Sequence, residues 1–460
     1  MRRAQDMEIE MTNTLTDVEG HSPSGRIFDP PLEDLVRRVA GPVLAGDDPR
    51  AAEEVATFNL AVTHRPAVVV GATCVEDVAA AVSWAVANGL PVAAQATGHG
   101  PVRAVEHALL VTTSRMKSVV VDADRRTAKV GAGVRWAEVI GAAAPYGLTG
   151  VSGSSSSVSV VGYSLGGGMG SLGRQYGFGA DQVFSVELVT ADGRIHHLDA
   201  DSEPDLFWAV RGGKANFGVI TAMEIGLVPV LTIYAGAVFF SAESAHDVLH
   251  SFRTWAPTLP EQTSTSVALM NFPPLEELPA PLRGQYVVML RFAHNGPEAE
   301  GAELLAPMIE AGEVLLSGVG ALPYTQVDAI HQDPTDPMPI WEKGGLLREL
   351  SVEAIEALLA VASPQVNTFL TMVEVRLMGG ALARQPRVPN AVAGREGAYT
   401  LLALGALPPG LEERVAEVGE SILDAMAPWS TGTSLLNWLG ETATPAEVAR
   451  AWTPTSTGGS

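Results

Sequence analysis

The chain has 460 residues, too many for one hydrophobic core, so we expect two domains or one domain with a large insertion. Hydrophobic residues make up 47% of the sequence and charged residues 18%, which excludes a largely disordered chain. The formal net charge of −23 argues against a nucleic-acid partner and against docking on anionic lipid.

The single cysteine, Cys74, excludes an intramolecular disulfide and a cysteine metal cluster, and we predict no metal site. No apolar run reaches the roughly 20 residues that span a bilayer, so we expect no membrane partner. Residues 1–25 carry paired arginines with no apolar segment behind them, which indicates a flexible tail rather than a signal peptide. We therefore expect a cytoplasmic protein, either a monomer or a homodimer.

The first predicted domain begins with short β-branched runs that alternate with helical stretches. Residues 66–72 predict a buried strand, and residues 75–89 predict a helix with acidic residues in its first turn and a closing glycine. Residues 91–100 predict a second strand that ends in a glycine-rich loop. This βαβ-like order favours α/β architecture at the start of the domain.

Two hairpins and a glycine-rich segment follow. The alternating segments 118–134 and 185–198 predict hairpins, with the sequences DADRR and ADG at their turns. A short helix is expected at 136–147. Between the hairpins, residues 150–181 form the part of the chain richest in glycine and serine.

This segment contains a glycine motif that is typical of dinucleotide-binding proteins. Residues 168–173 satisfy G-x-G-x-x-G, and Asp192 follows at the distance expected of a ribose-binding acid. The motif does not open a regular helix, however, and Asp192 precedes a glycine in a turn sequence. A nicotinamide dehydrogenase is therefore the weaker alternative. Two glycine loops, at 97–100 and 166–168, would instead let backbone N–H groups approach the pyrophosphate of a dinucleotide.

The pattern of predicted secondary structure changes after about residue 232. Long alternating strands are interspersed with amphipathic helices, which indicates an antiparallel sheet with helices over one face, a separate α+β module. No internal repeat of 20–50 residues is visible. The predicted strands are 232–240, 265–272, 286–294 and 369–382, and the predicted helices are 245–256, 298–310 and 351–362.

Three segments, 94–100, 160–195 and 205–230, resemble the FAD-binding domain of the berberine bridge enzyme-like oxidases. These belong to the vanillyl-alcohol oxidase and p-cresol methylhydroxylase (PCMH) superfamily. The resemblance spans residues 65–230 and returns weakly at 435–441. It implies an α+β fold: a two-part PCMH-type FAD-binding domain at 26–232, an α+β substrate domain at 233–430 whose antiparallel sheet covers the flavin, and a return to the FAD domain at 431–460.

The resemblance also implies how FAD is attached. The histidine that bonds to the 8α-methyl carbon of the flavin matches His99 here. Many members add a second bond from a cysteine, and the matching residue is Ser155, which cannot supply a thiolate. We therefore expect a monocovalent flavin. The late tyrosine-containing element of the family corresponds to 435–438, where Leu435 replaces the tyrosine and Asn437 is expected nearest the cofactor.

The remaining cofactor contacts that the resemblance implies are mostly backbone groups. Those expected at the pyrophosphate are Ala96, Thr97, Gly98, His99 and Gly100. Those expected around the flavin are Ser154, Ser155, Ser156, Val161, Gly162, Leu165, Gly166, Gly167 and Gly170. Val219 and Ile220 are expected at the edge of the adenine or flavin ring.

Two kinds of side chain are candidates for catalysis, a carboxylate with an arginine and a set of phenols. Glu374 and Arg376 lie two apart on a predicted strand and so share one face, where a carboxylate could act as base and the arginine could tune it. A structural ion pair is the alternative. Tyr324 is a phenol candidate, as are Tyr286 and Tyr399, although each also fits a packing role. Further side chains considered for the flavin domain or the pocket are Tyr176, His331 and Trp341.

The function implied is a two-electron oxidase of a small natural-product or sugar-like molecule that reduces O₂ to H₂O₂. The lysine-poor, alanine-rich composition is typical of a GC-rich bacterial genome, where relatives often act in secondary metabolism. Two alternatives stay open: a flavin-dependent oxygenase of a biosynthetic pathway, and a redox-silent FAD-containing cyclase or binding protein.

Overall fold

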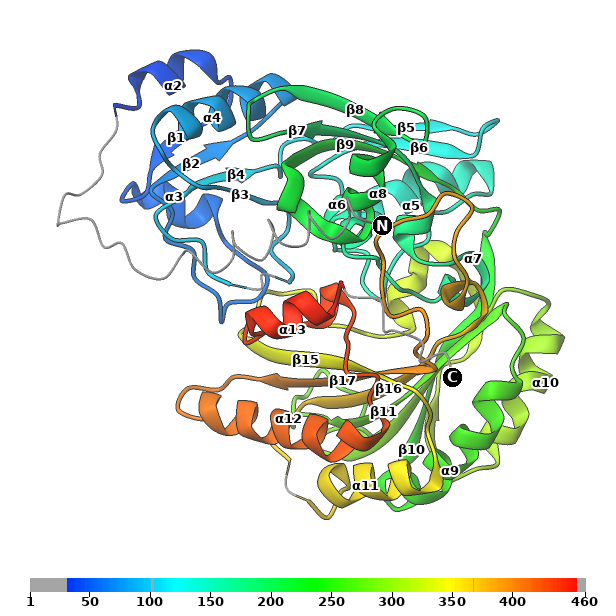
Figure 1. The fold of residues 1–460 in the computed structure, drawn as a ribbon. Coiled ribbons are helices and arrows are strands. Elements are labelled where there is room, and N and C mark those ends of the chain that lie inside the picture. The colour runs from blue at the N-terminus through cyan, green and yellow to red at the C-terminus, as the bar shows by residue number, and fades with distance from the viewer. Residues whose placement is uncertain (1–30, 101–102, 367, 453–460) are drawn as a thin grey trace, which may run out of the picture.

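The computed structural model describes residues 31–100, 103–366 and 368–452, so the expected tail at 1–25 lies outside the described residues. Three sheets organise this part of the chain: two smaller ones above and one large one below (Figure 1). None of the helices described has both the length and the apolar character needed to cross a membrane.

The first sheet has the order β1-β2-β4-β3, in which β2, β4 and β3 are parallel and β1 is antiparallel. The predicted strands and helix near its start are confirmed, because apolar side chains of β2 and of α4 share one core. Its elements are α2 (Glu33–Arg38), β1 (Val43–Ala45), α3 (Pro49–Glu54), β2 (Val68–Gly71), α4 (Val75–Ala87), β3 (Val92–Gln95) and β4 (Leu109–Thr112).

The second sheet is antiparallel, in the order β5-β6-β9-β7-β8. Both predicted hairpins are confirmed, as β5 pairs with β6 and β7 with β8. Asp192 lies in the β7–β8 turn, where its carboxylate accepts hydrogen bonds from Thr190 and Arg194, so it is a turn residue and not a ribose ligand. The elements are β5 (Val119–Asp122), β6 (Thr127–Gly131), α5 (Trp136–Ala143), α6 (Val160–Leu165), α7 (Gly173–Tyr176), β7 (Val183–Val189), β8 (Ile195–Asp199), α8 (Pro204–Gly213) and β9 (Val219–Gly226).

The third sheet is the large antiparallel sheet predicted for the second half of the chain. Its order is β13-β10-β12-β11-β16-β17-β15, and β14 also pairs with β10. The chain enters it after β9, at Thr232, which is where the sequence texture changes. The strands are β10 (Thr232–Ser241), β11 (Thr263–Asn271), β12 (Tyr286–His294), β13 (Val314–Ser317), β14 (Gly320–Pro323), β15 (Ile340–Leu347), β16 (Met372–Leu377) and β17 (Tyr399–Ala406).

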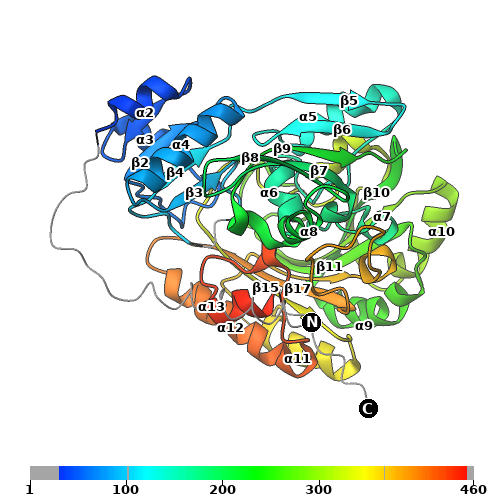
Figure 2. The same ribbon diagram turned by 45° about the horizontal axis from the view of Figure 1, so that its top comes forward.

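The helices α9 to α12 cover one face of this sheet, as Figures 1 and 2 show. Alternate strand residues such as Val288, Leu290 and Val375 pack beneath these helices in one apolar core. The opposite face, with Met289 and Met372, looks toward the two smaller sheets. The α+β class is therefore confirmed. The covering helices are α9 (Ala245–Trp255), α10 (Glu298–Ile309), α11 (Val352–Ala362) and α12 (Glu412–Met426). The last helix, α13 (Pro445–Arg450), lies on the other side of β15 (Figure 1).

Buried polar contacts hold the large sheet against the glycine-rich segment. Arg174 of α7 donates to three backbone carbonyls of the segment 259–263. Asp181 forms an ion pair with Arg395, with the two atoms 2.6 Å apart and both side chains only 6% exposed. Because breaking such a buried pair leaves an uncompensated charge, these contacts fix the relative position of the two halves of the molecule.

Candidate active site

His99 lies in the loop after β3, between two hydroxyl groups. Its Nδ1 is 3.0 Å from Oγ1 of Thr97 and its Nε2 is 3.1 Å from Oγ of Ser157. The imidazole stacks on the ring of Phe58, with the ring planes 8° apart. Burial, aided by repulsion from Arg135, lowers the pKa of His99 to about 4, so the ring is neutral near pH 7 and one nitrogen keeps a lone pair.

The serine segment 154–157 lies beside this histidine. Oγ of Ser155 is 2.7 Å from Oγ of Ser157, which in turn contacts His99. The backbone N–H of Ser156 donates to Asp328 at 2.7 Å. Two segments that are 58 residues apart in sequence therefore form one hydroxyl–imidazole chain, and the position predicted for a second flavin attachment, Ser155, is part of it.

The glycines after α6 pack around one aromatic ring. A Cβ on Gly168, whose φ is +76°, would lie 2.4 Å from the ring of Tyr163, and a Cβ on Gly179 would lie 2.7 Å from it. Glycine is thus required at 168 both by backbone conformation and by the closeness of Tyr163. Gly170 has a similar packing role, because a Cβ there would overlap the carbonyl oxygen of Ser152.

The C-terminal element reaches the same region. The amide of Asn437 donates to the carbonyl of Tyr163 at 2.9 Å, and its carbonyl oxygen Oδ1 would touch a Cβ placed on Gly166. The backbone oxygen of Asn437 lies 4.0 Å from the Cβ position of Gly100. The structure thus brings together the first glycine loop, α6 and the C-terminal segment, as expected of parts of one cofactor site.

The remaining predicted cofactor residues lie on the same framework. Val161, Gly162 and Leu165 belong to α6, and a Cβ on Gly162 would have open space around it. Val219 and Ile220 begin β9, with side chains in two different cores. The cofactor contact stays a prediction for all of these positions, and also for Ala96, Gly98, Ser154 and Gly167.

Lys214 is a cation that the sequence analysis did not single out. It follows α8 with a positive φ of 54°, and its Cε would lie 2.7 Å from a Cβ on Gly166. Burial lowers the pKa of Lys214 to about 8 against the attraction of Glu342 on β15. Burial and repulsion from Glu441 raise the pKa of Glu342 to about 7.

This arrangement predicts a pH effect on stability. The pKa of Glu342 is raised from 4.5 to about 7 in the folded chain, so folding favours the protonated carboxyl. Its stabilising contribution is complete below about pH 4.5 and is lost as the pH rises through 7. Glutamine does not ionise, so Glu342→Gln should not lose stability in this way. We expect the urea midpoint of the variant to rise relative to that of the wild type as the pH increases from 5 to 8. A difference that stays constant with pH would contradict the assignment.

Glu374 and Arg376 face the smaller sheets from β16 and join a third residue. Oε1 of Glu374 is 2.7 Å from Nη1 of Arg291 on β12 and accepts a hydrogen bond from Ser266 at 2.6 Å. Its Oε2 is 2.9 Å from Nη2 of Arg376, whose guanidinium lies 5.3 Å from the ring centre of Trp438. The exposed fractions of Glu374, Arg291 and Arg376 are 1%, 2% and 9%.

These contacts decide between the two interpretations of Glu374. Burial alone would raise its pKa, but Arg376 and Arg291 outweigh burial and hold the pKa well below its usual range. Such a carboxylate has little affinity for a proton and so is a poor general base. The ion-pair interpretation fits this geometry better, with Glu374 orienting Arg376.

Tyr324 lies at the start of η6 (Tyr324–Ala329), with its hydroxyl 3.0 Å from Oγ of Ser152. Burial raises the pKa of Tyr324, so it stays a neutral phenol. His331, a few residues on, interacts with Arg376, and burial together with that arginine lowers the pKa of His331 well below 6.5. His331 is thus placed near the Arg291–Glu374–Arg376 cluster, whereas Tyr324 contacts the glycine-rich domain through Ser152.

The other aromatic candidates lie elsewhere. Tyr286 and Tyr399 point into the core beneath the helices, and the Tyr286 hydroxyl donates to the carbonyl of Ala362. Trp341 packs in that same core, so its suggested place in a pocket was wrong. Tyr176 lies in α7 and packs against the core of the glycine-rich domain.

Several buried donors near this face suit a polar ligand. The hydroxyl of Tyr163 and the Nε atoms of Arg291 and Arg376 are buried with no hydrogen-bond partner within the described part of the chain. Unpaired donors of this kind are costly, and a bound polar molecule would satisfy them. Together with the neutral imidazole at His99, they offer hydrogen-bond donors to a polar bound group.

Comparison with known proteins agrees with this geometry. Residues 66–199 match the model of a family described as FAD binding domain. The chain is 27% identical over 331 residues to an uncharacterized FAD-linked oxidoreductase of Bacillus subtilis, covering 70% of this chain and 71% of that one. It is 32% identical over 210 residues to (R)-6-hydroxynicotine oxidase of Paenarthrobacter nicotinovorans, covering 45% and 43% of the two chains. A solved chitooligosaccharide oxidase superposes with a TM-score of 0.78 at 18% identity, covering 91% and 92%.

The protein is therefore an FAD-linked oxidoreductase, with FAD as its cofactor. A solved BBE-like protein of Physcomitrella patens also superposes with a TM-score of 0.79 at 18% identity, covering 91% and 93% of the two chains, so the fold agrees with the resemblance seen in the glycine and histidine motifs.

Proposed function

We propose that this protein is an oxidase that takes two electrons from a small organic substrate and passes them to O₂, forming H₂O₂, with its FAD attached only to His99. Bound FAD supplies the two-electron acceptor and the reaction with O₂. The observation that carries the proposal is the neutral, partly buried imidazole of His99, next to Ser157 and Ser155 and across from a sheet with unpaired arginine donors.

The environment of His99 supports attachment there. A neutral imidazole would supply the lone pair for a C–N bond to a flavin methyl carbon, and a pKa of about 4 keeps it available throughout the physiological range. The C–N bond would replace one methyl C–H bond and the imidazole N–H bond, and the two protons and two electrons released would pass to O₂ as H₂O₂. Ser155 supports attachment at one residue only. Its hydroxyl forms a hydrogen bond with Ser157 and is a far weaker nucleophile than a thiolate. The ring nitrogen that bonds to the flavin must give up its hydroxyl contact. Loss of the Thr97 contact would therefore indicate Nδ1, and loss of the Ser157 contact would indicate Nε2.

On the opposite side, we assign Arg376 to hold an oxygen or nitrogen of the substrate. Nη2 of Arg376 pairs with Glu374, and the guanidinium lies over the ring of Trp438. These contacts fix the guanidinium, while its Nε–H has no hydrogen-bond partner among the described residues. A fixed, charged donor of this kind orients a polar group without a further ordering cost. Alcohols and amines, the classes oxidised in such reactions, carry such a group.

Arg376→Met tests this assignment. The variant keeps the Glu374–Arg291 pair and so should fold, while losing one charged hydrogen bond to the substrate. We expect kcat/KM to fall by about 10- to 100-fold, mainly through KM, as removal of such a bond typically costs. Arg384→Met, which removes an exposed ion pair with Glu261, is the matched control and should leave both constants unchanged. Equal kcat/KM in the wild type and Arg376→Met would refute the role.

The fate of oxygen separates the oxidase from an oxygenase. An oxidase yields one H₂O₂ for each substrate molecule that loses two electrons and two protons, and ¹⁸O₂ leaves no label in the product. Substrates for the first screen are 6-hydroxynicotine and chitooligosaccharides, because solved oxidases named for these molecules share this fold. Label in the product would favour an oxygenase, and a flavin that no substrate reduces without air would favour a redox-silent protein.

A further inference from the structure

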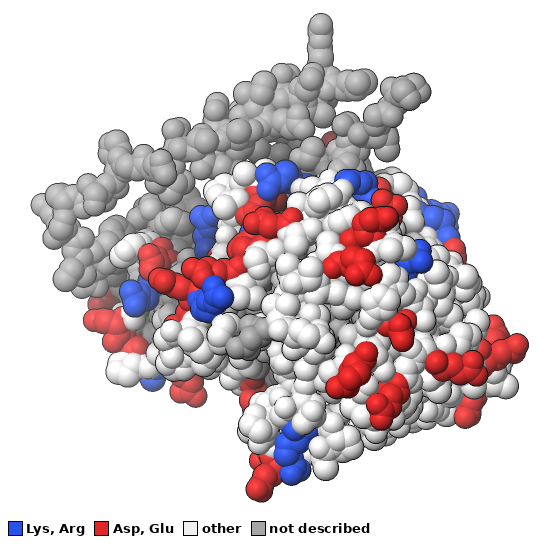
Figure 3. Space-filling model, turned by 90° about the horizontal axis from the view of Figure 1, so that it is seen from below, with Lys and Arg blue, Asp and Glu red and all other residues white. Residues whose placement is uncertain are grey.

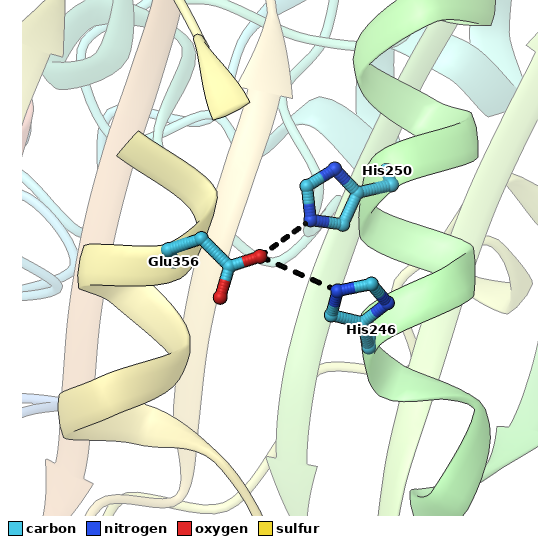
Figure 4. A group of neighbouring side chains, drawn as sticks. All are labelled: His246, His250 and Glu356. Carbon is cyan, nitrogen blue, oxygen red and sulfur yellow. Dashed lines mark hydrogen bonds and ion pairs between the residues drawn. The ribbon is translucent and has the colours of Figure 1, made fainter. Parts of the chain in front are cut away.

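Two histidines and a glutamate meet on the outer side of the helix layer, away from the FAD-binding half. His246 and His250 lie four residues apart on α9 and so project from one side of that helix. Glu356 reaches them from α11, as Figure 4 shows. Their exposed side-chain fractions are 61%, 21% and 54%, so an ion in solution can reach them.

The distances between these groups suit a shared metal ion. Oε1 of Glu356 is 3.0 Å from Nε2 of His250 and 3.3 Å from Nε2 of His246. One ligand atom from each of the three residues lies within 4.8 Å of the others. Ligands at about 2.0–2.1 Å from a tetrahedral zinc ion are separated by about 3.4 Å, so two of the three edges are nearly formed already.

A second carboxylate orients one of the ligands. Nδ1 of His246 is 3.1 Å from Oδ1 of Asp247, which leaves Nε2 directed at Glu356. Metal-bound histidines almost always donate their other ring nitrogen in this way, and the contact both fixes the ring and strengthens the ligand. His246 therefore has the carboxylate partner on its second ring nitrogen that is typical of a metal-bound histidine.

The surroundings favour a cation as well. His246 and Glu356 border a hollow of about 350 Å³, whose wall also includes Glu243 and Ser363. Acidic side chains outnumber basic ones on the side formed by these helices, which Figure 3 shows from below. The chain as a whole carries a net charge of −23, so its field attracts divalent cations.

We propose that His246, His250 and Glu356 bind one divalent transition-metal ion, with zinc the best match, and that the ion cross-links α9 to α11. Two imidazoles and one carboxylate are a ligand set that zinc prefers, and three protein ligands leave one position for water or for an anion in the hollow. The site is independent of the flavin, so its failure would leave the proposed oxidase function intact.

The test uses the flavin-loaded enzyme without a histidine tag, stripped with EDTA and dialysed. Calorimetry with ZnCl₂ is expected to show one ion bound per chain, and the same addition is expected to raise the melting temperature, since an ion that binds only the folded chain stabilises it. Cobalt(II) is expected to give the intense visible absorption of a tetrahedral site.

Variants then locate the ion. His250→Gln and Glu356→Gln should each weaken zinc binding by at least tenfold and abolish the cobalt spectrum, and Asp247→Asn should weaken it by on the order of tenfold. The control is His196→Gln on β8, which removes a single histidine–carboxylate pair with Glu203 and should leave zinc binding unchanged. Absence of stoichiometric binding, or binding that His250→Gln and Glu356→Gln leave unchanged, would overturn the proposal.

Discussion

Replacing His99 with alanine is expected to leave FAD bound but no longer attached, so that denaturation releases all of it. The rate of flavin reduction should fall by about tenfold or more, equivalent to at least about 1.4 kcal/mol in the barrier. The physical reason is that an imidazole bonded to the flavin withdraws electron density and raises its oxidising power. Anaerobic stopped-flow reduction and a redox titration measure the two effects, and the potential should shift downward.

The matched control for this experiment is His64→Gln. His64 is another buried imidazole of the same domain, with Nε2 2.8 Å from Gln95 and Nδ1 accepting from the Val105 N–H, and burial lowers its pKa too. Its loss should reduce stability but leave the flavin attached and the potential unchanged. A His99→Ala enzyme whose flavin still resists denaturation would rule out attachment at this residue.

The second large effect concerns stability. Glu374→Gln would leave Arg291 and Arg376 buried without their shared carboxylate, and breaking a buried pair in this way costs about 3–5 kcal/mol. Because the folded-state pKa of Glu374 is depressed, its contribution is present above about pH 4.5 and is lost as the pH falls below that. Urea unfolding near neutral pH should therefore show a large loss, which shrinks in acid.

Two comparisons make this result decisive. Glu261→Gln breaks an exposed pair with Arg384 and should cost at most about 1 kcal/mol. The double variant Arg291→Met with Glu374→Leu leaves only Arg376 without the carboxylate and should recover part of the stability. If Glu374→Gln instead unfolds like the wild type but has lost its activity, Glu374 is the general base and the ion-pair interpretation is wrong.

Much of the fold could be predicted because its signals are local. The alternation of side chains on β16 and β12 and the apolar spacing of α4 depend on neighbours within a few residues. The hairpin at Asp192 was recognisable from its turn residues, which was enough to set aside the dinucleotide motif at 168–173. The order of strands in the large sheet had no such local signal.

That order decides the site. Glu374 and Arg376 were found together because they are two residues apart on one strand, whereas Arg291 is 83 residues away and meets them only because β11 lies between β12 and β16. Lys214 and Glu342 come together across the two halves of the molecule in the same way. Long-range pairings of this kind have no periodicity that a single sequence displays.

The glycines illustrate a different limit. Density of glycine around 166–170 correctly indicated a place where backbones approach closely, but the ring of Tyr163 and the backbone of Ser152 account for Gly168 and Gly170. Spacing alone could not distinguish glycines that admit a neighbouring side chain from glycines that admit a ligand.

A single covalent bond between FAD and His99 can be tested directly by one measurement. The purified yellow protein is denatured in acid, separated from free flavin, digested and analysed by mass spectrometry. We predict that the flavin stays with the protein and that one peptide, containing His99, carries the added mass of FAD, while the peptide containing Ser155 is unmodified. Free FAD in the supernatant together with an unmodified His99 peptide would contradict the account.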